Sequence, residues 1–132
     1  MAISQPPLVL VVDDEPPIRE MERRILEKRG YRVLEAPGGA EGVAMLKDGK
    51  PIDLLIADLD MPEIPGEEMV RQIRTARPDL KVLYVTAHID RLLDVRATLW
   101  EGEAFLDKPF TTRGLEEAVS LLLYGRLSTE RR

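Results

Sequence analysis

The chain has no cysteine, so it contains no disulfide framework, no thiolate metal centre and no cysteine nucleophile. It also has no apolar run near the roughly 20 residues of a membrane-spanning helix, and its first residues lack the basic start of a signal peptide. A net charge of -5 disfavours direct nucleic-acid binding, because such binding needs a basic surface. These absences predict a cytoplasmic protein that neither crosses a membrane nor binds nucleic acid itself.

The composition is that of an ordinary folded domain. Of the 132 residues, 44% are apolar and 33% are charged, which argues against disorder and allows one hydrophobic core. We expect a short lead-in at 1–7, a single domain at 8–124 and a C-terminal tail at 125–132.

Five short apolar segments have the character of β-strands, and they cover 8–12, 31–36, 54–57, 81–86 and 104–106. The segments 8–12 and 54–57 contain no polar residue, which is typical of strands buried on both faces of a parallel sheet. The segment 31–36 includes Arg32 and Glu35, so it suits a sheet edge. The sequence therefore predicts two edge-like strands, the second and the short fifth, beside three apolar ones.

Apolar residues at helical spacing separate the strands. The first helix is expected between Asp14 and Gly30, with Ile18, Met21, Ile25 and Leu26 facing the core. Further helices are expected at 40–47, around Met69 to Ile73, at 91–100, and after a cap at Thr111 or Thr112. Alternating strands and helices predict a three-layer α/β/α domain whose parallel sheet has the flavodoxin-like strand order 2-1-3-4-5.

Carboxylates stand where two of the buried strands end. Asp13 and Asp14 follow the first strand and Asp58 follows the third; these strands are neighbours in the expected order, so the three acids meet in one crevice. Taken singly, Asp14 is also a good helix cap and Asp58 a good turn residue. Two carboxylates about 4 Å apart repel by roughly 4 kcal/mol at an effective dielectric near 20, so the cluster needs protons, basic partners or a cation. Hard oxygen ligands favour Mg²⁺ over Zn²⁺.

Two further polar residues end strands on the same rim. Thr86 offers a hydroxyl and Lys108 an ammonium group, and both groups bind anion oxygens. Individually, Thr86 also fits a plain strand end and Lys108 a solvated loop. A metal, a carboxylate nucleophile, a hydroxyl donor and a lysine together indicate a site for a phosphoryl group.

The order and spacing of four short motifs carry a family resemblance. They are Val-Val-Asp-Asp-Glu at 11–15, Asp-Leu-Asp-Met-Pro at 58–62 with Gly66 beyond, Val-Thr-Ala at 85–87, and Lys-Pro-Phe at 108–110. Over 8–124 the chain resembles the CheY-like receiver domain of two-component response regulators. Each motif alone is weak, whereas the set is specific.

The resemblance implies that Asp58 accepts a phosphoryl group from the phosphohistidine of a sensor histidine kinase or phosphotransfer protein. Asp14 and Asp58 would bind Mg²⁺, or Mn²⁺ in its place, directly, with Asp13 acting through water and the Asp60 backbone carbonyl as a further ligand. Lys108 would pair with Asp58 and precede a cis proline.

A conformational switch and its output surface are also implied by the resemblance. Thr86 would move toward the phosphoryl group and Phe105 would turn inward, although periodicity alone makes Phe105 a core residue. The helix at 91–100, the strand at 104–106 and the final helix would form the face for a downstream effector, and a candidate homodimer interface.

Four residues depart from the usual family pattern. Asp60 and His88 lie where the family controls water access, and we hypothesise that they set the rate of self-dephosphorylation. Glu103 replaces a small residue and Pro65 stands where an acid is common; both are expected to affect loop shape and not the chemistry.

Two other functions remain open on the sequence. Asp58-Leu59-Asp60 superficially matches the nucleophile motif of haloacid-dehalogenase-like phosphatases, although that motif belongs on a first strand. A pseudo-receiver that docks without being phosphorylated is the second alternative. The sequence identifies neither the cognate kinase nor the effector.

Overall fold

A computed structural model of the chain describes residues 5–61, 66–88 and 102–125. Along these ranges the strands and helices follow one another as β1 (Leu8–Val12), α1 (Pro16–Lys28), β2 (Arg32–Ala36), α2 (Gly39–Lys47), β3 (Leu54–Asp58), α3 (Gly66–Ala76), β4 (Lys81–Thr86), β5 (Glu103–Asp107) and α5 (Thr112–Tyr124). The expected helix at 91–100 lies outside the described residues.

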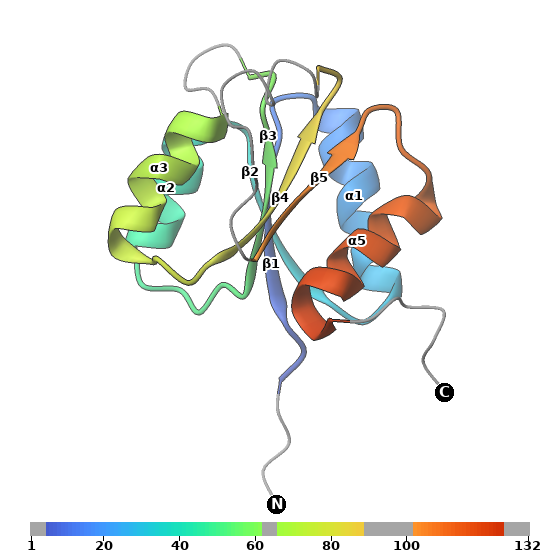
Figure 1. The fold of residues 1–132 in the computed structure, drawn as a ribbon, viewed down its shortest axis with the longest axis horizontal. Helices are drawn as coiled ribbons and strands as arrows, with labels where there is room; N and C mark the ends of the chain where they lie inside the picture. Colours follow the sequence, from blue (N-terminus) through green and yellow to red (C-terminus); the bar gives the residue numbers. More distant parts are fainter. Residues whose placement is uncertain (1–4, 62–65, 89–101, 126–132) are drawn as a thin grey trace, which may run out of the picture.

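The five strands form one parallel sheet in the order β2-β1-β3-β4-β5. Helices α2 and α3 cover one face of this sheet, and α1 and α5 cover the other (Figure 1). The predicted three-layer fold and strand order are confirmed. The polar segment at Arg32 and Glu35 forms the edge strand β2, as its composition indicated.

Alternation along the central strands divides the core into two layers. Leu10 and Leu55 belong to the layer against α2 and α3, whereas Val9 and Leu54 belong to the layer against α1 and α5. All five residues of β1 and all five of β3 are buried. This double burial explains why the two strands have uninterrupted apolar sequences before their terminal acids.

The helix ends are built from local sequence signals. Pro16 and Pro17 occupy the first turn of α1, where backbone N–H groups have no helical partner. Asp14 is not the cap of this helix: the N-cap position is Glu15, and no side chain caps it. At α5 the Thr111 hydroxyl accepts a hydrogen bond of 2.9 Å from the Gly114 amide. Thr111 is therefore the capping threonine of the two proposed.

One expected core position on α1 is wrong. Met21 is 38% exposed, and Glu22 is buried in its place at 1% exposure, together with Ile25 and Leu26. The spacing of Ile18, Glu22, Ile25 and Leu26 gives a straighter helical stripe than one through Met21. Geometry therefore places a carboxyl group in the layer between α1 and the sheet.

None of the helices within the described ranges combines the length and apolarity that crossing a bilayer requires.

Candidate functional site

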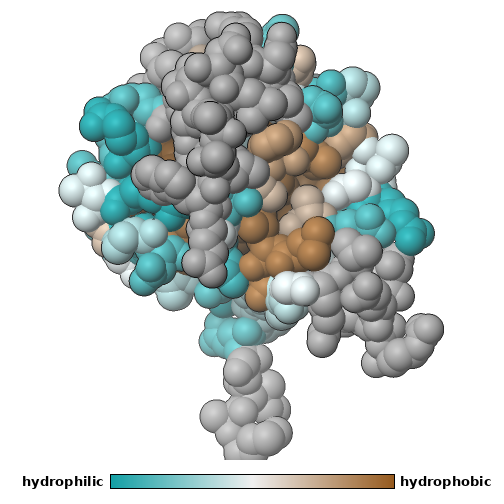
Figure 2. All heavy atoms as spheres, in the orientation of Figure 1, coloured by the Kyte–Doolittle hydropathy of each residue, from teal (hydrophilic) through white to brown (hydrophobic). Residues whose placement is uncertain are grey.

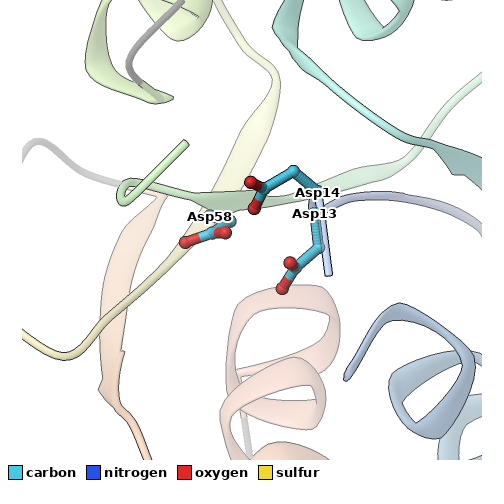
Figure 3. A group of neighbouring side chains, drawn as sticks. All are labelled: Asp13, Asp14 and Asp58. Carbon is cyan, nitrogen blue, oxygen red and sulfur yellow. The ribbon is translucent and has the colours of Figure 1, made fainter. Parts of the chain in front are cut away.

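The three predicted acids meet at the carboxyl edge of the sheet. In the β1–β3 register Val12 faces Ala57, so the next residues, Asp13 and Asp58, leave the sheet side by side. One carboxylate oxygen from each of Asp13, Asp14 and Asp58 lies within 4.8 Å of the others (Figure 3). Asp13 and Asp58 are buried at 1% exposure and Asp14 is exposed, so the cluster opens to solvent on one side.

Lys108 reaches this cluster from the loop between β5 and α5. Its Nζ donates a hydrogen bond of 3.1 Å to Asp58 Oδ1 and lies 3.8 Å from Asp13 Oδ2 and 3.6 Å from Glu15 Oε1. The Lys108 amide donates to the Thr86 carbonyl at 2.9 Å, which fixes the loop against β4. The Lys108–Pro109 peptide bond is cis, as the resemblance implied.

Burial and neighbouring charges change the proton affinities of the cluster. Burial raises the pKa of Asp13 to about 7; the Glu15 amide opposes this rise, and the nearby Asp58 charge adds to it. Burial alone would lower the pKa of Lys108, but the Asp13, Asp58 and Glu15 carboxylates outweigh it, and the net direction is upward. Lys108 is therefore a permanent cation at neutral pH.

Each buried aspartate has one satisfied and one unsatisfied oxygen. Asp13 Oδ1 accepts from the Glu15 amide at 2.9 Å, and Asp58 Oδ1 accepts from the Asp60 amide at 2.9 Å in addition to Lys108. Asp13 Oδ2 and Asp58 Oδ2 are buried without a hydrogen-bond partner in the described part of the chain. Unsatisfied buried anionic oxygens are costly, and a hard divalent cation would satisfy them. The donor set therefore fits Mg²⁺.

Thr86 is held by Asp60 and not by Asp58. Its buried hydroxyl, at the end of β4, donates to Asp60 Oδ1 at 2.9 Å and accepts from the His88 amide at 2.9 Å. The Ala87 amide donates to Asp60 Oδ2 at 3.0 Å. The predicted switch partner Phe105 is half-buried on β5, opposite Tyr84 in the register, and packs against the core layer beside α2 and α3.

The structure adds a buried carboxyl group that sequence reasoning missed. Both oxygens of Glu22 lack a hydrogen-bond partner within the described ranges. Burial raises the pKa of Glu22 to about 8; the Asp13 and Asp58 charges add to this rise and Lys108 opposes it. The helical spacing of α1 contains the signal, since Glu22 is spaced with Ile18, Ile25 and Leu26, but a glutamate is not an expected core residue.

An arginine that touches the acidic cluster was also missed. Arg19 on α1 donates to the Asp13 carbonyl at 2.7 Å and to Glu35 on β2 at 3.1 Å. Arg23, one helical turn later, pairs with the other Glu35 oxygen at 2.8 Å. Their i, i+4 spacing was visible in the sequence, but their common partner on the edge strand was not.

The expected loop role of Glu103 is wrong. Glu103 is the first residue of β5, and its side chain is 0% exposed. Its Oε2 accepts hydrogen bonds of 2.9 Å from the Tyr84 hydroxyl and from Arg74 on α3. These two contacts join Glu103 on β5 to Tyr84 on β4 and to Arg74 on α3. The Glu103 carboxylate lies in the core, where a charge needs such partners. Pro65 lies outside the described residues.

Fold and site together define a class of protein: a doubly wound α/β domain with an acidic, lysine-containing pocket at its topological switch point. The family model described as response regulator receiver domain matches residues 9–120. The chain belongs to the response regulator receiver domain family, a family of signalling domains in two-component systems.

Comparison with individual proteins gives the same result. The chain is 38% identical over 116 residues to the response regulator MprA of Mycobacterium ulcerans, covering 87% of this chain and 49% of that protein. It is 32% identical over 116 residues to the sensor kinase CckA of Brucella abortus, covering 87% of this chain and 12% of that protein. The response regulator TrrA of Thermotoga maritima, solved with Mg²⁺-BeF, superposes with a TM-score of 0.76 at 35% identity, covering 89% of this chain and 99% of that one.

The chain thus spans between about an eighth and a half of the length of the two curated relatives. It corresponds to a receiver domain that occurs both in response regulators and within a sensor kinase.

Proposed function

We propose that this domain is the phosphoacceptor of a two-component phosphorelay, and that Asp58 accepts a phosphoryl group from the phosphohistidine of a sensor histidine kinase or phosphotransfer protein. The observation that carries the proposal is the position of Asp58. Its carboxylate is buried beside Asp13 and Asp14, one oxygen is held by Lys108 and the Asp60 amide, and the other oxygen has no partner in the described structure.

The transfer is a displacement at phosphorus. The Asp58 carboxylate oxygen forms a bond to phosphorus as the phosphorus–nitrogen bond of the donor breaks; the leaving nitrogen keeps the bonding electron pair, and the imidazole takes up one proton. Lys108 neutralises charge on Asp58 before transfer and on a phosphoryl oxygen afterwards, from a position already fixed by the loop. The Asp60 amide holds Asp58 Oδ1 and so orients the carboxylate.

Asp13, Asp14 and Asp58 would hold Mg²⁺, or Mn²⁺, with Asp13 acting through water and the Asp60 backbone carbonyl as a further ligand. When bound, the cation neutralises negative charge on the phosphoryl oxygens during transfer. The support is the donor set itself: hard carboxylate oxygens from two strand ends, two of them buried and unsatisfied.

The output would follow from a shift between two packings. Thr86 moves to the phosphoryl group and Phe105 turns inward, which changes the face that includes β5 and α5. Figure 2 shows apolar side chains gathered over these elements, where Leu106, Phe110 and Leu122 are only partly buried. A downstream effector protein or domain, or a second copy of the chain, would bind there. We place the receiver unit at 8–124 and its action in the cytoplasm.

Asp60 and His88 are proposed to set the lifetime of the phosphoryl group. The support is their position after β3 and β4, where the Asp60 carboxylate and the His88 amide both hydrogen-bond the Thr86 hydroxyl. Self-dephosphorylation is measured as the loss of the phosphoryl mass with time in wild type, Asp60→Asn and His88→Ala. At least one of the two variants is expected to differ from wild type in this rate. Unchanged rates in both would contradict this role.

Intact-protein mass spectrometry after incubation with Mg²⁺ and acetyl phosphate tests the function. Wild type is expected to gain one phosphoryl group, and Asp58→Asn is expected to gain none. No gain in wild type would favour a pseudo-receiver. Catalytic turnover of a small phosphate ester by wild type would favour the haloacid-dehalogenase-like alternative.

A further inference from the structure

The Asp60 side chain binds both hydrogen-bond donors that follow β4. Its Oδ1 accepts from the Thr86 hydroxyl at 2.9 Å, and its Oδ2 accepts from the Ala87 amide at 3.0 Å. Both carboxylate oxygens of Asp60 therefore accept a hydrogen bond from the end of β4, although Asp60 itself is exposed. Charge-assisted hydrogen bonds of this kind are about twice as strong as neutral ones.

These donors lie directly beside the proposed phosphoacceptor. In the β3–β4 register Asp58 faces Val85, and the Leu59 amide donates to the Val85 carbonyl at 3.0 Å, so the two strands end side by side. Thr86 and Ala87 are the two residues that follow Val85, at the end of β4. The Asp60 backbone amide, which donates to Asp58 Oδ1, completes a group of three donors around the end of β3.

The hydroxyl of Thr86 has a single proton and therefore makes one strong donor bond at a time. That proton is already directed at Asp60, and the oxygen is occupied by the His88 amide. In the proposed switch, a phosphoryl group on Asp58 takes the same hydroxyl proton. The Ala87 amide follows at the end of β4, beside the end of β3, and would be a second donor to that group. Both donors must leave Asp60 before they can bind a second anion.

We infer that the Asp60 carboxylate is an internal competitor for the phosphoryl group: it occupies the Thr86 hydroxyl and the Ala87 amide in the unphosphorylated domain and holds the switch off. This inference rests on the proposed function of Asp58 and concerns the regulation of the same site. Asp60 is a positioning residue here, because it acts through Thr86 and Ala87. Since Asp60 is exposed, its displaced carboxylate turns into water, and its repulsion from the phosphoryl charge favours that displacement.

Beryllofluoride with saturating Mg²⁺ is the probe, as it stands for the phosphoryl group on Asp58. Its dissociation constant would be measured by amide NMR for wild type, Asp60→Ala and Asp60→Asn, with Mg²⁺ saturation verified for each. Losing a competitor bound by two charge-assisted hydrogen bonds is expected to tighten binding by about tenfold in Asp60→Ala. The amide of Asp60→Asn keeps an acceptor without the charge, so an intermediate value is expected.

The matched control is Asp107→Ala, which removes the same charge from an exposed carboxylate on the neighbouring strand, opposite Thr86 in the register. Its dissociation constant is expected to stay within about twofold of wild type, since general charge effects at this surface are small. Equal tightening in Asp107→Ala and Asp60→Ala would show a general charge effect and overturn the competition.

A second measurement needs no variant. In the wild-type domain the Ala87 amide nitrogen should show a scalar coupling across its hydrogen bond to the Asp60 carboxyl carbon, and beryllofluoride should abolish it. A coupling that is absent from the free domain or that persists in the adduct overturns the inference. If beryllofluoride and acetyl phosphate fail to modify wild type and every Asp60 variant, the proposed function fails; if all bind with equal affinity, only the competition fails.

Discussion

Glu22→Gln should stabilise the domain, although it replaces a charged residue on a helix by a neutral one. Glu22 is 1% exposed, and neither of its oxygens has a hydrogen-bond partner in the described part of the chain. Burial is the main cause that raises its pKa from 4.5 to about 8, with the Asp13 and Asp58 charges next in the same direction. The folded domain therefore holds this proton at pH values where the unfolded chain releases it.

The sign follows from this difference in bound protons. The folded-state pKa lies above the unfolded value, so the stability associated with protonated Glu22 is complete below pH 4.5 and is lost as pH rises toward 8. At 1.36 kcal/mol per pKa unit, the loss is roughly 3 kcal/mol at pH 7 and approaches roughly 5 kcal/mol above pH 8. Glutamine avoids this loss because it does not ionise.

Urea unfolding of wild type and Glu22→Gln between pH 5 and pH 9 tests this reasoning. The stability difference should favour the variant by roughly 1 kcal/mol at pH 5 and grow to several kcal/mol at pH 8. Glu20→Gln, an exposed position on the same helix, is the matched control and should change stability by less than about 0.5 kcal/mol at any pH. A stability difference for Glu22→Gln that does not vary with pH would refute the argument.

Two further predictions concern the acidic pocket and the buried ion pair. Protonation of Asp13, whose pKa is about 7, removes a negative charge from the metal site, so the apparent Mg²⁺ affinity should fall as pH drops below 7, by up to tenfold per unit. A thermal-shift titration with Mg²⁺ that is flat from pH 5.5 to 7.5 would contradict this. Arg74→Met should destabilise the domain by roughly 3–5 kcal/mol because it removes an ion-pair partner of the buried Glu103 carboxylate, and urea unfolding measures the loss. Replacing both Arg74 and Glu103 by apolar residues should recover much of that stability.

Much of the fold was predictable because its signals are local. The apolar segments 8–12 and 54–57 are typical of central strands of a parallel sheet, and polar Arg32 and Glu35 mark an edge. Once the strand order is set, the meeting of Asp13 and Asp58 follows, since carboxyl ends of parallel neighbours lie together.

The missed features depend on contacts between distant elements. The sequence predicts Met21 and not Glu22 in the core, and a loop effect for Glu103, because a carboxylate is usually exposed; only the packing of α1 and β5 buries the two glutamates. The hydrogen bond between Asp60 and Thr86 joins residues 26 positions apart. It depends on how the ends of β3 and β4 are aligned, and the hydrophobic periodicity of the sequence does not predict that alignment. Sequence reasoning therefore predicted which acids and which lysine meet at the edge of the sheet, whereas the structure was needed to find the buried and hydrogen-bonded groups around them.

The central claim is that a phosphoryl group is attached to the carboxylate of Asp58. Borohydride reduces an acyl phosphate to an alcohol, so treating the Mg²⁺- and acetyl phosphate-incubated domain with borohydride and sequencing its peptides by mass spectrometry identifies the modified residue. We predict that position 58 alone is converted to homoserine and that omitting Mg²⁺ prevents the conversion. Conversion at Asp13, Asp14 or Asp60 with Asp58 intact, or no conversion at any position, would contradict the account.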